Sequence, residues 1–255
     1  MKKISLVLLA CAGFVLNSNA ANNYAARVVS YNPGVNFAPA YTNTDAVLGE
    51  PSRVNPYTEA VDPFNPPYGI NQILSIGEGG SLVVEMDRPI FNTPRKPFGL
   101  DFIIFGNAGF IITNEFDLST FNWIGEPATD GSLFGINEGS ALVSVSADGL
   151  HFVPLTSPLA PTVDTLFPTD AAGSFDVPVN PQLTATDFAG ATLADMRALY
   201  AGSAGGAGFN IGWAQWHERG VHLPFVRYIR IDVPSGKAEI DGISAVARTA
   251  PGLQR

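Results

Sequence analysis

The segment from Val226 to Val233 constrains the fold of this chain more than any other stretch. One set of alternate positions holds Arg227, Ile229, Ile231 and Val233, and the other holds Tyr228, Arg230 and Asp232. Alternate residues of a β-strand point to opposite faces, so this pattern predicts a strand with one buried face. A second predicted strand, from Ala238 to Val246, follows a short turn. We expect these two runs to be the closing strands of a β-sandwich.

Further strands are predicted upstream. Ile73–Ile76 and Ser81–Asp87 flank a glycine-rich connection, and Leu150–Val153 follows Ala141–Ser146 after an Asp-Gly turn, which indicates a hairpin. The continuous apolar run Phe102–Phe105 predicts a central strand that is buried on both faces. We therefore predict an all-β, jelly-roll-like β-sandwich.

One short helix and one long loop complete the predicted architecture. Thr192–Tyr200 combines a capping Thr192, an acidic first turn and a shared apolar face, and Gly202 can end the helix. Residues 154–186 contain six prolines among short polar pieces. A loop of that length is uncommon unless it serves a function.

The first twenty residues have the features of a secretory signal. Lys2 and Lys3 precede an apolar run that is too short to span a membrane, and small residues end at Ala20. We predict a signal peptide over residues 1–20 and a single β-sandwich domain over 21–255. The alternative is a lipobox that ends at Cys11 and gives a lipidated N-terminus. Cys11 is the sole cysteine, so after signal removal no disulfide would remain.

The charge balance argues against nucleic acid as a partner. The whole chain has a net charge of −9, and loss of Lys2 and Lys3 leaves 12 basic against 23 acidic residues, or 23 − 12 = 11 negative charges. The basic residues are scattered singly, whereas nucleic-acid binding needs clustered cations.

Seven short motifs, in order along the chain, carry a resemblance to a known family. They lie at residues 30–34, 46–51, 74–82, 99–107, 143–149, 204–210 and 239–241. In this order they resemble secreted bacterial jelly-roll proteins, which are called cell surface proteins or PEP-CTERM-type exported proteins. The resemblance, which spans residues 30–246, implies the fold and export but no particular activity.

The chain departs from that family at two places. Family members often carry Asp where this chain has Asn210, which keeps an oxygen but loses a charge. Many members end in a Pro-Glu-Pro motif, a transmembrane helix and an arginine cluster. This chain stops at Arg255 without these features, so we expect no such anchor.

Five oxygen-bearing side chains fall at predicted strand ends and suggest a structural Ca²⁺ site. They are Asp101, Asn107, Asn210, Glu239 and Asp241. Hard cations take several oxygen ligands of this kind. Glu239 and Asp241, two apart in one predicted strand, would repel each other unless a cation or Arg230 lies between them. Turn caps and ordinary hydrogen bonds are the alternative interpretation.

Aromatic residues suggest a sugar-binding surface. Trp123, Trp216 and Tyr228 are the predicted ligand-binding residues, because flat aromatic rings match the apolar faces of pyranose rings; core packing is the alternative. Trp213 continues a predicted buried strand, and we expect it in the core.

Motifs of known enzymes fit the sequence poorly. His217 and His222 are five residues apart, whereas a zinc-binding helix needs a spacing of four. Ser203 follows a predicted helix, whereas a nucleophile elbow follows a strand. A carboxylate pair for a glycosidase could come from the acidic residues of the aromatic-rich segment, which are Glu115, Asp117, Glu126 and Asp130.

These patterns together predict a non-catalytic exported β-sandwich that binds a glycan or another extracellular or envelope surface, with a structural Ca²⁺. It would reside in the periplasm, at the cell surface or outside the cell. A secreted carbohydrate-active enzyme, either a glycosidase or a lyase, is the first alternative. A purely structural envelope component is the second.

Overall fold

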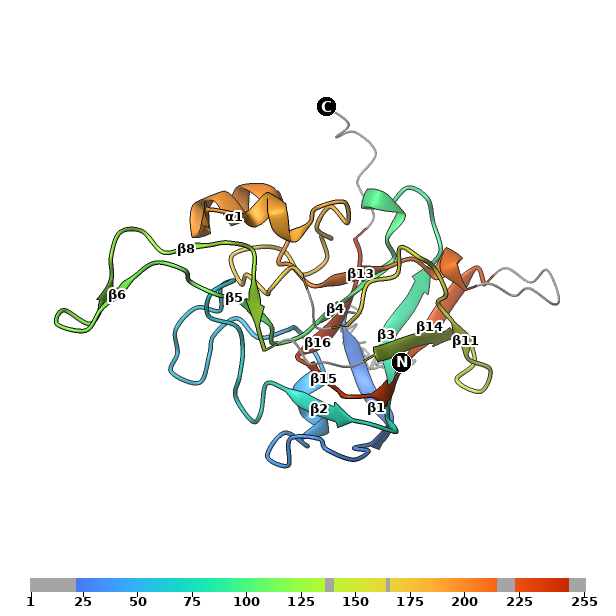
Figure 1. Cartoon of the computed structure of the whole chain (residues 1–255). Coiled ribbons are helices and arrows are strands. Elements are labelled where there is room, and N and C mark those ends of the chain that lie inside the picture. Colours follow the sequence, from blue (N-terminus) through green and yellow to red (C-terminus); the bar gives the residue numbers. More distant parts are fainter. Residues whose placement is uncertain (1–21, 136–139, 164–165, 215–222, 248–255) are drawn as a thin grey trace, which may run out of the picture.

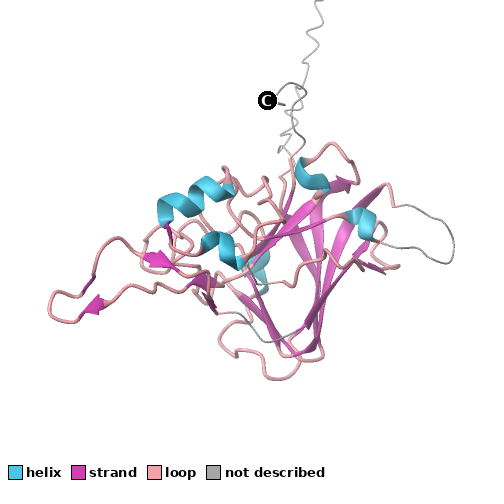
Figure 2. Cartoon of the chain, turned by 45° about the horizontal axis from the view of Figure 1, so that its top comes forward, coloured by secondary structure: helices cyan, strands magenta, loops and turns pink. Residues whose placement is uncertain are grey.

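The computed structural model describes residues 22–135, 140–163, 166–214 and 223–247, and its antiparallel sheets confirm the predicted all-β, sandwich-like fold (Figures 1 and 2). The predicted signal peptide, Cys11 and Trp216 lie outside the described residues. None of the helices in the described part has the length and apolar character needed to cross a membrane.

The largest sheet has five antiparallel strands in the order β1-β3-β14-β10-β11. They are β1 (Ala25–Asn32), β3 (Gly80–Phe91), β14 (Phe225–Ser235), β10 (Ser140–Ser146) and β11 (Val153–Pro154). The predicted hairpin is confirmed, because Val145 of β10 pairs with Val153 of β11. In β14, Ile229, Ile231 and Val233 are buried as predicted. A register shift before Tyr228 leaves Arg227 exposed, so the predicted alternation is wrong at that residue.

Two smaller antiparallel sheets face the large one across the main core. They have the orders β13-β4-β16 and β15-β2, with β13 (Ala207–Phe209), β4 (Phe102–Phe105), β16 (Gly242–Ala245), β15 (Lys237–Ile240) and β2 (Leu74–Gly77). Leu82 and Ile231 from the large sheet pack in one apolar cluster with Phe102 and Ile243 from the opposite layer. Full burial of each such side chain contributes about 1.5–3 kcal/mol, so this shared core holds the layers together.

Strand β4 is buried on both faces, as its continuous apolar run predicted. Phe102 and Ile104 point into the main core, while Ile103 and Phe105 pack in a separate cluster with Phe175. The ring of Phe105 meets that of Phe175 edge to face, with 5.2 Å between centroids. The second cluster therefore attaches the long loop to the outer face of β4.

The two strands predicted on either side of the glycine-rich connection are present as β2 and β3, and they belong to different sheets: β2 pairs with β15, whereas β3 pairs with β1 and β14. One predicted strand is wrong. The predicted single strand Ala238–Val246 is divided at Asp241, because β15 pairs with β2 and β16 pairs with β4. The chain thus passes from one sheet to another at Asp241, and Glu239 and Asp241 do not share the face of one continuous strand.

The predicted helix is present as α1 (Leu193–Tyr200). Thr192 and Asp195 form a capping box at its start, and Ala201 ends it in a left-handed conformation at φ 51°. Met196 and Tyr200 of α1 bury their side chains in a third cluster with Phe110 and Phe188. The described part of the chain also contains four short 3₁₀ helices, which are η1 (Thr44–Val47), η2 (Pro97–Gly99), η3 (Ala185–Phe188) and η4 (Ile211–Trp213).

A hairpin projects from the body beside α1, at the far left of Figure 1. We call residues 112–127 the hairpin arm; its core is the pair β6 (Phe116–Asp117) and β7 (Asn122–Trp123). The other short strands join its base to the body, and they are β5 (Gly109–Phe110), β9 (Leu133–Phe134), β8 (Ala128–Thr129) and β12 (Ala191–Thr192). β5 pairs with β9, and β8 pairs with β12 at the start of α1.

Candidate functional site

A groove of about 720 Å³ opens beside β13. Its walls come from η2, from the loops 158–161 and 179–183, and from Leu166 and Phe167. Most of these residues belong to the long proline-rich excursion that the sequence predicted, so one role of that loop is to build the groove. The volume lies within the range of about 300–1,000 Å³ that is typical of small-molecule sites.

Gly205 and Gly206 let the chain before β13 lie directly against the long loop and β4 at the groove wall. Gly205 has φ +86°, and a Cβ there would lie 2.4 Å from the carbonyl oxygen of Pro168. Gly206 has φ +80°, and a Cβ there would lie 2.5 Å from Cγ2 of Ile103. Larger residues would be excluded at both positions, both by contact and by backbone strain. The backbone N–H of Gly206 instead donates to the carbonyl of Phe167 at 2.8 Å, which joins β13 to the long loop.

Asn210 and Trp213 lie at the two ends of η4 on the groove wall. Asn210 caps η4, because its Oδ1 accepts from the backbone N–H of Gly212 at 2.6 Å. Its Nδ2 has no hydrogen-bond partner among the described residues. Trp213 is half-buried and packs edge to face on Phe209, at 6.4 Å between centroids, while it also lines the groove. The expectation that Trp213 lies in the core is therefore correct for one side of the ring only.

All of the described residues that line the groove are uncharged. Apolar side chains such as Phe98, Leu159 and Trp213 form most of the surface, and Asn180, Gln182 and Asn210 supply amide groups. Amides both donate and accept hydrogen bonds at neutral pH without titrating. The groove therefore suits an uncharged ligand with apolar faces and hydroxyl groups, and its described lining offers no carboxylate for acid–base catalysis.

A buried ion pair between Lys96 and Asp101 contacts the start of η4, which forms part of the groove wall. Lys96 Nζ lies 3.0 Å from Asp101 Oδ1, and both side chains are buried. The other oxygen, Oδ2, accepts from the backbone N–H of Ile211 at 2.9 Å and so fixes the start of η4. Burial raises the pKa of Asp101, while Lys96 and this amide oppose that change. Asp101, a predicted metal ligand, thus has an amino group as its immediate partner.

The other predicted metal ligands also contact protein groups. Glu239 binds Lys237 Nζ at 2.9 Å through Oε1 and Asn107 Nδ2 at 2.8 Å through Oε2. Arg230, the expected alternative partner of the acidic pair, binds Asp232 instead. Of the five predicted ligands, the structure joins only Asn107 to Glu239 by a described hydrogen bond. Among the described residues no group of three or more His, Cys, Asp or Glu side chains is placed to hold a metal ion.

Among the carboxyl groups of the predicted metal set, Asp241 has the pKa that burial shifts furthest from its ordinary value. It is 2% exposed, and it accepts from the backbone N–H of Ser52 at 2.9 Å and from the Ser52 hydroxyl at 2.7 Å. Burial raises the pKa of Asp241 to about 7, although both hydrogen bonds from Ser52 act in the opposite direction.

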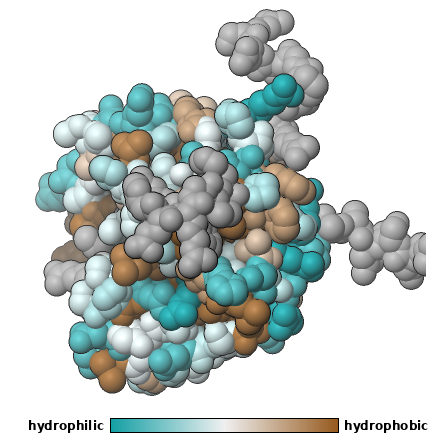
Figure 3. Space-filling view, turned by 90° about the vertical axis from the view of Figure 1, so that its right-hand side faces the viewer, coloured by the Kyte–Doolittle hydropathy of each residue, from teal (hydrophilic) through white to brown (hydrophobic). Residues whose placement is uncertain are grey.

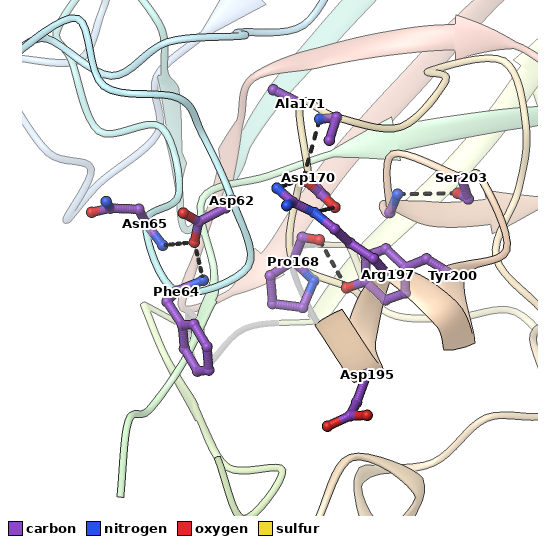
Figure 4. Close-up of polar contacts among 12 residues, drawn as sticks. Asp62, Phe64, Asn65, Pro168, Asp170, Ala171, Asp195, Arg197, Tyr200 and Ser203 are labelled. Carbon is purple, nitrogen blue, oxygen red and sulfur yellow. Dashed lines mark hydrogen bonds and ion pairs between the residues drawn. The ribbon is translucent and has the colours of Figure 1, made fainter. Parts of the chain in front are cut away.

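A second polar cluster lies between α1 and the loops around Asp62 and Asp170 (Figure 4). Arg197 of α1 makes a bidentate pair with buried Asp170, with Nε to Oδ2 at 2.9 Å and Nη2 to Oδ1 at 3.1 Å. Asp62 accepts from the backbone N–H groups of Phe64 and Asn65, and burial raises its pKa. These carboxylates do not line the groove, and their partners indicate a structural role that fastens α1 to the loops.

Two of the three predicted sugar-binding residues, Trp123 and Tyr228, lie on different parts of the molecule. Trp123 lies in β7 on the hairpin arm, 37% exposed, with its ring edge to face against Phe116 at 4.9 Å. Tyr228 lies in β14, half-buried, with its ring over the turn at Gly149. Trp216 lies outside the described residues. The four acidic residues considered for a glycosidase, Glu115, Asp117, Glu126 and Asp130, lie on or next to the convex hairpin arm.

Sequence reasoning singled out Asn210 and Trp213 for other roles and missed the remaining residues that line the groove. Asn180 and Gln182 sit beside Pro181 in a turn where the backbone N–H of Gln182 donates to Asn180 Oδ1 at 3.1 Å. The prolines marked this region as a loop but gave no signal that it faces β13. No family model and no curated protein matches the chain.

Proposed function

We propose that this chain is a non-catalytic exported protein whose groove binds an uncharged glycan. The observation that carries the proposal is the lining of the groove. It contains the half-buried ring of Trp213 and the amide groups of Asn180, Gln182 and Asn210, and its described residues include no charged group. Export and membership of the secreted jelly-roll family are parts of the same proposal, and they rest on the N-terminal sequence and on the ordered motifs.

Sugar chemistry matches such a lining. The axial C–H face of a pyranose ring is apolar and packs on a flat aromatic side chain, while its hydroxyls exchange hydrogen bonds with amides. Asn210 is well placed for this role, because capping uses its Oδ1 and leaves Nδ2 to donate. A charged sugar would lose hydration in the groove without gaining a partner of opposite charge there, so neutral sugars are the preferred class.

The experiment is a screen of neutral oligosaccharides with the purified protein, followed by calorimetric titration of any sugar that binds. We expect Asn210→Asp to weaken binding about tenfold or more, because it removes the donor and adds a charge while Asp still caps η4. Trp213→Ala should weaken binding as well. Trp123→Ala, on the hairpin arm, is the matched control and should bind like the wild type.

Melting curves of all three variants separate loss of the site from loss of the fold. Two results would refute the proposal: no neutral glycan binds the wild type, or Trp123→Ala loses binding while both groove variants retain it. The calcium hypothesis makes the opposite prediction for Asn210→Asp, which should then gain affinity for Ca²⁺ and melt at a higher temperature when Ca²⁺ is added.

A further inference from the structure

Strand β13 forms the edge of its sheet beside the groove. Among the described strands it pairs with β4 alone, and its residues Ala207 and Gly208 line the groove. The outer edge of such a strand carries backbone N–H and C=O groups that no neighbouring strand occupies. The hydrogen bonds around β4 and β13 identify which of these groups face the groove.

The backbone groups of β4 alternate between its two neighbouring strands. The carbonyls of Asp101 and Phe105 accept, at 2.9 and 2.8 Å, from the backbone N–H groups of the residues that flank β16. Backbone groups of every second residue point to the same edge of a strand, so those of Ile103 also point toward β16. Ile103 therefore makes no backbone hydrogen bond to Gly208, which lies opposite it in β13.

Phe209 gives the same result from the side of β13. Its carbonyl accepts from the backbone N–H of Asp101 at 2.7 Å, so its backbone groups face β4. The N–H and C=O of the preceding residue, Gly208, point to the opposite edge, and neither has a hydrogen-bond partner among the described residues. Gly208 is half-buried. It therefore presents one donor and one acceptor side by side at the groove.

Glycine at position 208 keeps this edge open. A Cβ there would lie 2.6 Å from Cδ1 of Leu100, a buried residue that also lines the groove. Any larger residue would have to displace Leu100 from its packing. Glycine thus allows the side chain of Leu100 to pack against the strand while the polar backbone groups remain accessible.

The free edge is only one residue long. Before it, the N–H of Gly206 donates to the carbonyl of Phe167 at 2.8 Å, and after it the carbonyl of Asn210 accepts from the N–H of Trp213 at 3.1 Å. A peptide strand pairs through every second residue, so it would find its other partners here already engaged. The edge suits a compact ligand that carries one acceptor next to one donor.

Two hydroxyl groups on adjacent carbons of a sugar ring match this backbone pair. One hydroxyl oxygen accepts from the N–H of Gly208 while the neighbouring hydroxyl donates to its C=O. Neither bond involves a charge, in keeping with the uncharged described lining of the groove. Such a lining is a local feature, because on the face shown in Figure 3 hydrophilic residues are spread among the apolar ones.

We propose, on the premise that the groove binds a neutral glycan, that Gly208 selects glycans with a vicinal diol, which is a pair of free hydroxyls on adjacent ring carbons. The ring of Trp213 packs on the apolar face of the sugar, and the backbone of Gly208 binds the diol at the edge of the sugar ring. A single hydroxyl satisfies only one of the two backbone groups. The other group then loses its contact with water without gaining a partner, so glycans without the diol bind more weakly.

The experiment is amide hydrogen exchange followed by NMR on isotope-labelled protein purified after export. Without sugar, the N–H of Gly208 should exchange rapidly, whereas that of Phe209, which faces β4, should be protected. Cellotetraose, maltotetraose and mannotetraose are the probes, because their sugar units carry adjacent free hydroxyls. The tetrasaccharide that binds should slow exchange at Gly208 about tenfold or more and shift its amide resonance. The amide of Gly79, in the turn before β3, should not change.

Two comparisons isolate the backbone groups. Analogues of that tetrasaccharide in which one hydroxyl of the adjacent pair is replaced by hydrogen should bind about tenfold more weakly. Gly208→Pro removes the N–H, whereas Gly208→Ala keeps it, and both place a Cβ against Leu100. Proline is tolerated where the N–H of an edge strand faces away from its neighbour, so the two variants should melt alike. Gly208→Pro should bind about tenfold more weakly than Gly208→Ala.

The outcomes separate this inference from the function on which it rests. Glycan binding stands and the role of Gly208 is overturned in three cases: its amide is as protected as that of Phe209 without sugar, the deoxy analogues bind like their parent, or a tetrasaccharide whose affinity depends on Trp213 leaves the Gly208 amide unchanged. Equal binding by Gly208→Pro and Gly208→Ala would also overturn it. If none of the three tetrasaccharides binds, the inference fails together with the proposal that the groove takes neutral glycans.

Discussion

Asp241 should make the free energy of unfolding fall as pH rises, whereas most carboxylates in folded proteins make it rise. In the folded state burial raises its pKa from 3.8 to about 7, so the folded protein retains a proton that the unfolded chain has released. Between these pH values the folded state binds more protons, and the free energy of unfolding must fall as pH rises. The contribution of Asp241 is complete below about pH 4 and is lost as pH rises through 7.

The magnitude follows from the two pKa values. The pKa of Asp241 rises from 3.8 in the unfolded chain to about 7 in the folded protein. Because each pKa unit corresponds to about 1.4 kcal/mol, the free energy of unfolding should fall by at most about 4 kcal/mol between pH 4 and pH 8. Asp241→Asn should remove this dependence, because the amide resembles the protonated acid. Its Oδ1 can accept from the backbone N–H of Ser52 while its Nδ2 donates to the Ser52 hydroxyl. The variant should be more stable than the wild type at pH 8 and close to it at pH 4.

Urea unfolding at unit steps from pH 4 to pH 8 measures this effect. Asp187→Asn is the control: hydrogen bonds from Thr184 lower the pKa of Asp187, so its contribution is present above the ordinary pKa of 3.8 and is lost only as pH falls through the lowered pKa. Its loss should therefore shift the curve about equally from pH 4 to pH 8. Parallel curves for the wild type and Asp241→Asn would refute the reasoning. So would a wild-type stability that rises with pH when Ca²⁺ is present, because a bound cation favours the carboxylate.

Two further predictions concern the core and the helix. Ile231→Ala should cost about 2–5 kcal/mol through lost burial and a cavity, and Val83→Ala, which removes less volume from the outer face of β3, should cost less in urea unfolding. Arg197→Ala should lower the free energy of unfolding by about 3 kcal/mol, because it leaves the buried carboxylate of Asp170 without its cation. Arg27→Ala, which removes a surface ion pair, should lower it by less than about 1 kcal/mol. Equal losses for the two variants would contradict the structural role of the Arg197–Asp170 pair.

Local patterns were sufficient to predict several of the main elements of this fold. The four apolar residues Phe102–Phe105 identified a strand buried on both faces, because no polar residue interrupts the run. Thr192 and Asp195 identified the start of α1 by their spacing alone. Each of these features depends on contacts between near neighbours or on a simple period, and both are visible in a sequence.

Relations between distant segments could not be predicted in the same way. Residues 238–246 were predicted as one strand, and no local pattern in them indicates that the chain changes sheets at Asp241. The predicted closeness of Glu239 and Asp241 failed for that reason. The shift before Tyr228 depends on how β3 and β14 align, which turned Arg227 outward. The groove arises where five separate described stretches of the chain converge, so no local motif marks it.

The distribution of charge links the groove to the kind of ligand that it accepts. Lys and Arg are absent from the sequence between Pro97 and Met196, a region that supplies the hairpin arm and most of the groove lining. An anionic ligand would approach through a negative potential and would find no cation among the described lining residues. A neutral ligand experiences neither effect, so its affinity should hardly change between low and high salt. A strong salt dependence of binding would therefore place the ligand outside the groove.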